Sequence, residues 1–179
     1  PEHPDTLASL NNLANSLSDQ GQYAEAEVLH REALEIWERV LGPEHPDTLA
    51  SLNNLANSLY GQGQYAEAEA LHRKALEIQE RVLGPEHPET LLSLNNLALS
   101  LNSQGQYAEA EALYRKTMEI QEGVLGPGHP DALLSFTNLA NSLYGQGQYA
   151  EAETLHREVL EIRERVLGPE HPDTLSSLN

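Results

Sequence analysis

The sequence predicts an all-α solenoid of stacked helix pairs, and three observations predict it. The string Gly-Pro-Glu-His-Pro recurs at a spacing of 42 residues, beginning at Gly42, Gly84 and Gly168, with a near copy at Gly126. Within each copy, apolar residues recur at the three- and four-residue spacing of a helix. Glycines and prolines stop the predicted helices at the same places in every copy. Because one helix pair cannot bury its own apolar stripe, neighbouring copies must stack.

We expect residues 1–179 to form a single solenoid of four full repeats and a partial fifth. The repeats are 1–42, 43–84, 85–126 and 127–168, followed by 169–179. The first two repeats differ at only five positions, so they must occupy similar environments. The chain begins at Pro1 and not at a methionine, and we expect it to be a fragment of a larger protein.

The first helix of each repeat is predicted to begin at the proline of His-Pro and to end before a glycine. Pro4 suits the first helical position, where its missing N–H costs nothing, and Asp5 suits the positive end of the helix dipole. Gly21 ends the helix, because glycine readily adopts the left-handed conformation of a C-cap. The apolar stripe of this helix consists of Leu7, Leu10, Leu13, Ala14 and Leu17.

The second helix is expected from about Tyr23 to Leu41, where Gly42-Pro43 ends it. Its apolar positions are Ala26, Leu29, Ala33, Leu34, Ile36 and Val40. Glutamate and arginine also recur four residues apart on its surface, in the order that stabilises a helix by about 0.2–0.5 kcal/mol per pair. The predicted pairs are Glu27–Arg31, Glu35–Arg39, Glu69–Arg73, Glu77–Arg81, Glu111–Arg115, Glu153–Arg157 and Glu161–Arg165.

Composition excludes several classes of function. The chain has 28 acidic residues against 10 Lys and Arg, a net charge of −18, which repels phosphate backbones and anionic lipids. We therefore expect no nucleic-acid and no membrane partner. The absence of cysteine excludes disulfides, thiolate metal sites and a cysteine nucleophile. No apolar run approaches the roughly 20 residues that span a bilayer, and we expect a cytoplasmic protein.

No pattern of residues indicates an enzyme, a cofactor or a metal site. The linker histidines lack a second ligand four residues away and are expected to pack or cap the loops; they are His3, His45, His87, His129 and His171. The other histidines, His30, His72 and His156, are expected to pack at the edge of the core. Paired carboxylates such as Glu25 and Glu27 diverge on a helix and predict a solvated face.

The residues of each repeat resemble the tetratricopeptide repeat. The resemblance covers essentially the whole chain and, in the first repeat, rests on Leu10, Leu13, Ala14, Leu17, Gly21, Tyr23, Ala26, His30 and Ala33. The family's proline near the end of the second helix is absent, and that helix is longer. This 42-residue variant resembles the repeats of kinesin light chains and, more closely, the arrays behind NB-ARC-type immune-receptor-like proteins. The resemblance implies a right-handed superhelix whose first helices line a concave, peptide-binding groove.

Differences between the copies concentrate on one face of the first helix, which we call the variable face. Its positions fall within an arc of roughly 100° beside the apolar stripe. They are Ala8/Ala50/Leu92/Leu134, Asn11/Asn53/Asn95/Thr137, Asn15/Asn57/Leu99/Asn141, Ser18/Tyr60/Asn102/Tyr144 and Asp19/Gly61/Ser103/Gly145. Exposed positions can simply drift, yet the second-helix residues Glu25, Glu27, Arg31 and Glu35 are identical in all four copies. A face that varies on a constant scaffold indicates recognition.

Beside the variable face lies an invariant asparagine row, formed by Asn12, Asn54, Asn96 and Asn138. An amide offers both a donor and an acceptor, so the row could hold the backbone of an extended peptide. Alternatively, each asparagine bonds to the helix of the neighbouring repeat. Tyr60 and Tyr144 offer flat contact area, or they cover the turn between the two helices. The predicted ligand-binding residues are Asn11, Asn12, Asn15, Asn53, Asn54, Asn57, Tyr60, Asn95, Asn96, Asn102, Asn138, Asn141 and Tyr144.

The sequence therefore predicts a repeat scaffold that binds a peptide or protein segment on the concave face of its first helices. All ten basic residues lie in second helices, which favours a neutral or basic ligand over an acidic one. Three alternatives remain: a structural spacer or self-association module without a specific ligand, part of an enzyme or ATPase switch whose chemistry lies elsewhere, and a designed consensus-like array.

The two ends of the array carry separate expectations. Residues 169–179 should dock on the last second helix, around Leu155, Val159 and Ile162, as an incomplete cap with Leu175 and Leu178 on its apolar stripe. Surfaces left open at the ends are complementary, which predicts weak end-to-end self-association. Trp37, the single tryptophan, is either a surface anchor or a cover for the open first repeat.

Overall fold

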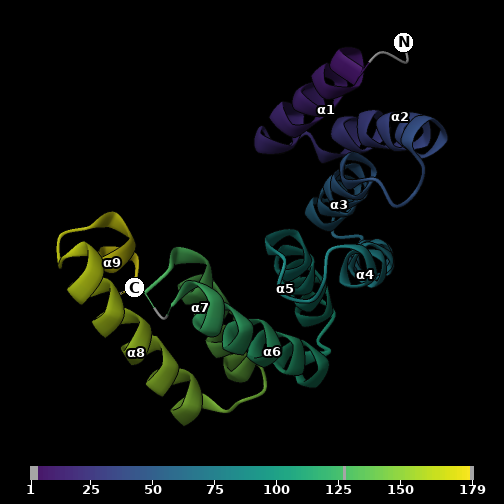
Figure 1. Ribbon diagram of the computed structural model, residues 1–179. Coiled ribbons are helices and arrows are strands. Elements are labelled where there is room, and N and C mark those ends of the chain that lie inside the picture. Colours follow the sequence, from purple (N-terminus) through teal and green to yellow (C-terminus); the bar gives the residue numbers. More distant parts are fainter. Residues whose placement is uncertain (1–3, 127, 178–179) are drawn as a thin grey trace. The chain divides into compact units, whose positions relative to one another are not determined.

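The computed structural model describes residues 4–126 and 128–177, and every regular element in them is a helix (Figure 1). Two helices occupy each repeat, which confirms the all-α prediction and the predicted bounds of the first pair. The helices are α1 (Pro4–Asp19), α2 (Tyr23–Leu41), α3 (Pro46–Gly61), α4 (Tyr65–Val82), α5 (Pro88–Ser103), α6 (Tyr107–Leu125), α7 (Pro130–Gly145), α8 (Tyr149–Leu167) and α9 (Pro172–Ser176).

The chain divides into two compact units, Pro1–Ser100 and Leu101–Asn179. In the first unit, α2 packs against α1 and α3, and α3 packs against α4. In the second unit, α7 packs against α6 and α8, and α9 packs against α8. Within each unit, helices thus pack both within a repeat and against the next repeat, as α2 does with α1 and α3, which is how the apolar stripes are buried.

The helix ends follow local signals that the sequence contains. The Nδ1 atom of each described linker histidine accepts a hydrogen bond from the backbone N–H two residues later, at 3.2 Å for His45 and Asp47. The same cap recurs at His87, His129 and His171. This confirms the capping alternative for the linker histidines. At the other end, Gly21 has a φ of +76°, and the N–H of Gln22 reaches back to the carbonyl of Leu17 at 2.9 Å.

The apolar stripe of each first helix forms the core. In α3, all five stripe residues are at most 2% exposed: Leu49, Leu52, Leu55, Ala56 and Leu59. Leu34 from α2, together with Ala68 and Ala75 from α4, completes this cluster. In the second unit the core contains Leu133, Phe136, Val159 and Ile162.

The surface-anchor alternative for Trp37 was wrong. Its side chain is only 4% exposed and packs with Leu7 and Ala33 inside the first repeat. Of the apolar stripe of α1, Leu13 stays open, with 54% of its surface exposed, because the described contacts of α1 are with α2 and α3.

The short helix α9 docks on α8, as expected for a partial cap. One Arg163 guanidinium nitrogen of α8 donates to the carbonyl oxygen of Asp173 at 3.1 Å and to Ser177 Oγ at 2.6 Å. Thr174 is buried, whereas Leu175 is 48% exposed and does not join the core. Leu178 lies outside the described residues.

Candidate interaction surface

The predicted ligand-binding residues fall into three groups by exposure. Two are buried, namely Asn53 and Asn95. Six are half-buried: Asn11, Asn54, Tyr60, Asn96, Asn102 and Asn138. Five are exposed: Asn12, Asn15, Asn57, Asn141 and Tyr144.

Asn53 is committed to contacts inside the array. Its side chain is 4% exposed, and its Nδ2 donates to Ser93 Oγ of the next repeat at 2.8 Å. Its Oδ1 accepts from His72 Nδ1 of α4 at 3.3 Å. The alternative for the asparagine row was a bond to the neighbouring repeat. In the second repeat that bond is made by Asn53 and not by Asn54, the member of the row that follows it.

The asparagine row itself stays available. Within the described residues, no side-chain amide of this row takes part in a hydrogen bond, although all four residues are identical in type and position. Asn12 is exposed and the other three are half-buried. Successive helix residues lie about 100° apart, so Asn54 faces away from the α5 contact that Asn53 makes.

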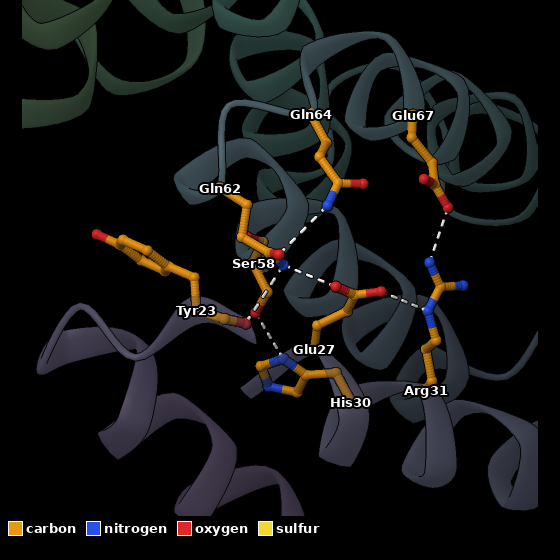
Figure 2. Close-up of polar contacts among 8 residues, drawn as sticks. All are labelled: Tyr23, Glu27, His30, Arg31, Ser58, Gln62, Gln64 and Glu67. Atoms are coloured by element: carbon orange, nitrogen blue, oxygen red, sulfur yellow. Dashed lines mark hydrogen bonds and ion pairs between the residues drawn. The ribbon is translucent and has the colours of Figure 1, made fainter. Parts of the chain in front are cut away.

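His30 connects the first two repeats beneath the variable face. It is 1% exposed, and its Nδ1 lies 2.9 Å from Ser58 Oγ of α3 (Figure 2). Its Nε2 lies 3.2 Å from Asn15 Oδ1 on α1, and Ser58 Oγ lies 3.2 Å from Ser18 Oγ. Burial lowers the pKa of His30 to about 4, so the ring is neutral at neutral pH. The expected packing of this histidine at the core edge is confirmed.

A polar chain joins the same two repeats at the edge where the helix pairs turn (Figure 2). Gln62 Nε2 of the second repeat donates to Glu27 Oε2 at 2.7 Å, and Arg31 Nε donates to Glu27 Oε1 at 2.7 Å. A second Arg31 nitrogen reaches Glu67 Oε1 at 2.7 Å. The hydrogen bonds from Gln62 and Arg31 hold the pKa of Glu27 below its usual value.

The second unit repeats this polar chain. Gln146 donates to Glu111 at 2.7 Å, and Arg115 binds both Glu111, at 2.9 Å, and Glu151, at 2.6 Å. Four of the predicted pairs within one helix are confirmed: Glu27–Arg31, Glu69–Arg73, Glu111–Arg115 and Glu153–Arg157. The other three predictions were wrong: Arg81 binds Glu44 at 2.9 Å and not Glu77, and among the described residues Glu35 and Glu161 form no ion pair. The sequence also missed the bonds to the next repeat. The invariance of Glu27 and Arg31 in all copies was the available signal, and this contact between repeats explains it.

The tyrosines of the variable face lie against the tyrosines that begin the next helix. The ring centres of Tyr60 and Tyr65 are 5.2 Å apart, and those of Tyr144 and Tyr149 are 5.0 Å apart. Each pair spans the turn between the two helices of a repeat. Tyr60 also packs on the core, whereas Tyr144 is 63% exposed.

In the second unit, two predicted residues line one hollow. It has a volume of about 630 Å³ and is bordered by Asn141, Tyr144, His156, Val159, Arg163 and Ser177, among others. Side-chain amide, phenol, imidazole, guanidinium and aliphatic groups meet there. Such a mixture of polar and apolar groups suits a peptide.

Among the described residues, no cluster of three or more histidine, aspartate and glutamate side chains is placed to hold a metal ion. None of the described helices combines the length and the apolar character that crossing a bilayer requires.

Comparison with known proteins assigns the repeats. One model of the tetratricopeptide repeat matches the chain three times, over residues 5–80, 50–122 and 89–145. A second model of this repeat matches residues 133–173. No curated protein matches the chain.

Solved structures support the same assignment. Two structures of the nearly identical TPR-like repeats of a Podospora anserina protein, assigned to the kinesin light chains, are 36% identical to this chain. One superimposes with a TM-score of 0.87 over 98% of this chain and 82% of its own, the other with 0.86 over 99% and 84%. BtubC (BKLC) from P. vanneervenii shares the fold at 22% identity, with a TM-score of 0.80 over 93% of this chain and 66% of its own.

Proposed function

The chain belongs to the tetratricopeptide repeat family, whose arrays are generally protein-interaction scaffolds, and we propose that it binds a peptide or protein segment on its first helices. The ligand would lie along the asparagine row and the exposed part of the variable face. Asn53 and Asn95, which are buried, would support this surface from beneath.

One observation carries the proposal. The asparagine row is invariant, yet none of its side-chain amides bonds to another described residue. Two other invariant side chains, Glu27 and Arg31, have a visible role in joining repeats. A repeated amide without an internal partner has its donor and acceptor free for the backbone of an extended ligand.

The charge of the surface selects the kind of ligand. No first helix contains Lys or Arg, and the chain carries a net charge of −18. A neutral or basic segment therefore fits, and its binding should weaken with added salt if it is basic. Acidic peptides would meet no positive partner on the first helices.

For the array as a whole, we propose one continuous right-handed solenoid with a concave ligand face, of the 42-residue kinesin-light-chain-like type found in NB-ARC-associated proteins. It would act in the cytoplasm as the sensing or interaction part of a larger protein, without catalytic activity of its own.

The test uses peptides selected from a displayed random library on the wild-type chain. Replacing both Asn54 and Asn96 by alanine should weaken binding by about 1–3 kcal/mol, or roughly 5- to 150-fold in Kd, because ligand groups lose their partners. Titration calorimetry measures the affinity, and circular dichroism should show unchanged helicity.

Asn53→Ala is the matched control, one residue away on the same helix. It should lower the stability, since it leaves Ser93 and His72 without their partner. An affinity unchanged by the Asn54 and Asn96 substitutions would refute the proposal.

A second candidate, weak end-to-end self-association, is favoured by one observation. Leu13 is 54% exposed, whereas its equivalents Leu55, Leu97 and Leu139 are at most 2% exposed. Sedimentation at rising concentration and high salt, where the negative charge is screened, should show association. A monomer under those conditions would exclude this candidate.

A further inference from the structure

Two positions change together among the four repeats. The variable-face position occupied by Asn15 is asparagine in three repeats, and the second-helix position occupied by His30 is histidine in the same three. In the third repeat both differ, with Leu99 at the first position and Tyr114 at the second. An exposed position that merely drifts has no reason to change together with a buried one.

In the first repeat the two positions are in direct contact. His30 Nε2 lies 3.2 Å from Asn15 Oδ1, and the amide oxygen can only accept, so Nε2 carries the proton. The neutral ring has one N–H, and its Nδ1 therefore accepts from the hydroxyl of Ser58 at 2.9 Å. Both ring nitrogens are engaged in a side chain that is 1% exposed, so the ring is held in place. Figure 2 shows the contact with Ser58.

This contact decides which way the Asn15 amide faces. Its oxygen points to His30, so its NH2 group is the part left for a ligand, and no described residue bonds to that NH2 group. Leu99, the equivalent residue of the third repeat, is half-buried and presents only apolar surface.

The second repeat uses its histidine differently. His72 Nδ1 donates to Asn53 Oδ1 at 3.3 Å, so in His72 the proton is on Nδ1, whereas in His30 it is on Nε2. The amide of Asn57 has no such partner. His72 therefore supports a buried asparagine, and it is an internal control for the role of His30.

We propose that His30 is a specificity-determining positioning residue, which turns Asn15 into a hydrogen-bond donor for a carbonyl oxygen of the bound peptide. The His30–Asn15 pair would make the first repeat a polar reader, and Leu99 offers apolar surface at the equivalent place of α5. A peptide bound to the first unit would thus present carbonyl oxygens to α1 and an apolar side chain to α5. This inference rests on the proposed function.

The first experiment needs no ligand. Nitrogen-15 NMR of the wild-type imidazoles should show the proton of His30 on Nε2 and that of His72 on Nδ1. His30→Tyr should move the side-chain amide signal of Asn15 and leave that of Asn57 in place, whereas His72→Tyr should leave that of Asn15 in place. A proton on Nδ1 of neutral His30 would reverse the Asn15 amide and overturn the proposal.

A double substitution tests the coupling of the pair. Asn15→Leu combined with His30→Tyr, the combination of the third repeat, should recover part of the Tm that His30→Tyr loses alone. Strictly additive losses would show that the two positions are independent and would overturn the proposal.

Binding separates this inference from the proposed function. A peptide selected on the wild type should bind the Asn15→Leu/His30→Tyr variant roughly tenfold more weakly, which corresponds to one lost hydrogen bond. Peptides selected on the variant should gain an apolar residue. If that variant keeps the wild-type affinity while the Asn54 and Asn96 substitutions weaken it, the inference fails and the proposed function stands. If no peptide is selected, both fail.

Discussion

The junction of α2 with α3 and the junction of α6 with α7 occupy equivalent places in their units. Both have the same polar contacts at the turn edge, which is the side of the array where the two helices of a repeat are joined. Gln62 binds Glu27 at 2.7 Å in the first junction, and Gln146 binds Glu111 at 2.7 Å in the second. Arginine links consecutive repeats in both, through Arg31 and Arg115. The polar contacts at the turn edge are thus the same in both junctions, and they fix how one repeat packs against the next.

The interiors of the two junctions differ. Beside the first, Trp37 is buried against Leu7 and Ala33, and neither its indole N–H nor the Ser51 hydroxyl of α3 has a partner among the described residues. In the second, Gln121 stands at the position of Trp37 and accepts from Ser135 Oγ at 2.6 Å. Apolar burial dominates one interior, and a buried hydrogen bond is added in the other.

The comparison shows that the buried residue at this position can change from tryptophan to glutamine while the polar contacts at the turn edge stay the same. Exposed ion pairs add little energy individually, about 0–1 kcal/mol, so their constancy reflects geometry more than stability. The interior supplies most of the stability, and substitutions there should separate the two junctions.

The largest effect is expected at Trp37. Trp37→Ala should lower the free energy of unfolding by about 3–5 kcal/mol, because it removes a large buried side chain. Gln121→Ala should cost less, about 1–3 kcal/mol, since it mainly removes the buried hydrogen bond from Ser135. Urea unfolding followed by circular dichroism measures both.

Trp37→Gln sharpens this result. The amide can accept from Ser51, as Gln121 does from Ser135, so this variant should be more stable than Trp37→Ala. Equal or lower stability of Trp37→Gln would contradict the comparison.

Acid should weaken the first junction more than the second. The pKa of His30 falls from 6.5 to about 4 on folding, so between these values the unfolded chain binds a proton that the folded chain refuses. Stability contributed by the neutral ring is therefore present above pH 6.5 and is lost as the pH falls towards 4, by about 2 kcal/mol at pH 4.5. His72, whose pKa is also about 4, behaves alike.

The check is urea unfolding of the wild type and His30→Tyr at pH 7 and pH 4.5. A tyrosine ring, such as Tyr114 at the equivalent position of the second junction, does not change charge between pH 4.5 and pH 7, so the variant should lose less stability on acidification. Parallel losses in the two proteins would contradict the assignment.

Substitutions of two glycines at the turn edge, Gly61 and Gly145, test whether the packing there is equally tight in the two junctions. A Cβ at Gly61 would lie 2.5 Å from the Tyr23 ring, and one at Gly145 would lie 2.7 Å from the Tyr107 ring. Alanine at either place should cost about 1–2 kcal/mol, because the ring must move. Gly61→Ala should cost more, since its clash includes the inner Cγ atom of Tyr23.

Thermal unfolding of the two alanine variants measures these costs. Adding Tyr23→Ala to Gly61→Ala removes the clash, so the double variant should lose less than the sum of the single losses. No loss in either single variant would show that the rings are free to shift.

The smallest effect is expected at Gly123 in α6. Gly123→Ala should raise the stability by about 0.5–1 kcal/mol, because glycine destabilises a helix interior and nothing lies within 4 Å of the new Cβ. In the wild type, hydrogen exchange should be faster over residues 119–126 than over the equivalent 35–42. Equal protection of the two segments would contradict the prediction.

The sequence by itself determined the parts of this protein that depend on neighbouring residues. The bounds of α1 and α2 followed from Pro4, Gly21 and Gly42, because caps and turns are made within a few positions of the chain. The ion pair of Glu27 with Arg31 followed from their spacing of one helical turn.

Only the tertiary structure decided which of two adjacent asparagines is internal. Asn53 and Asn54 look alike in sequence, but a rotation of about 100° turns one towards Ser93 of the next repeat and leaves the other without an internal partner. Trp37 is buried and Arg31 reaches Glu67, 36 residues away, for the same reason. Such contacts depend on how one helix pair is set against the next, and local spacing does not encode that geometry.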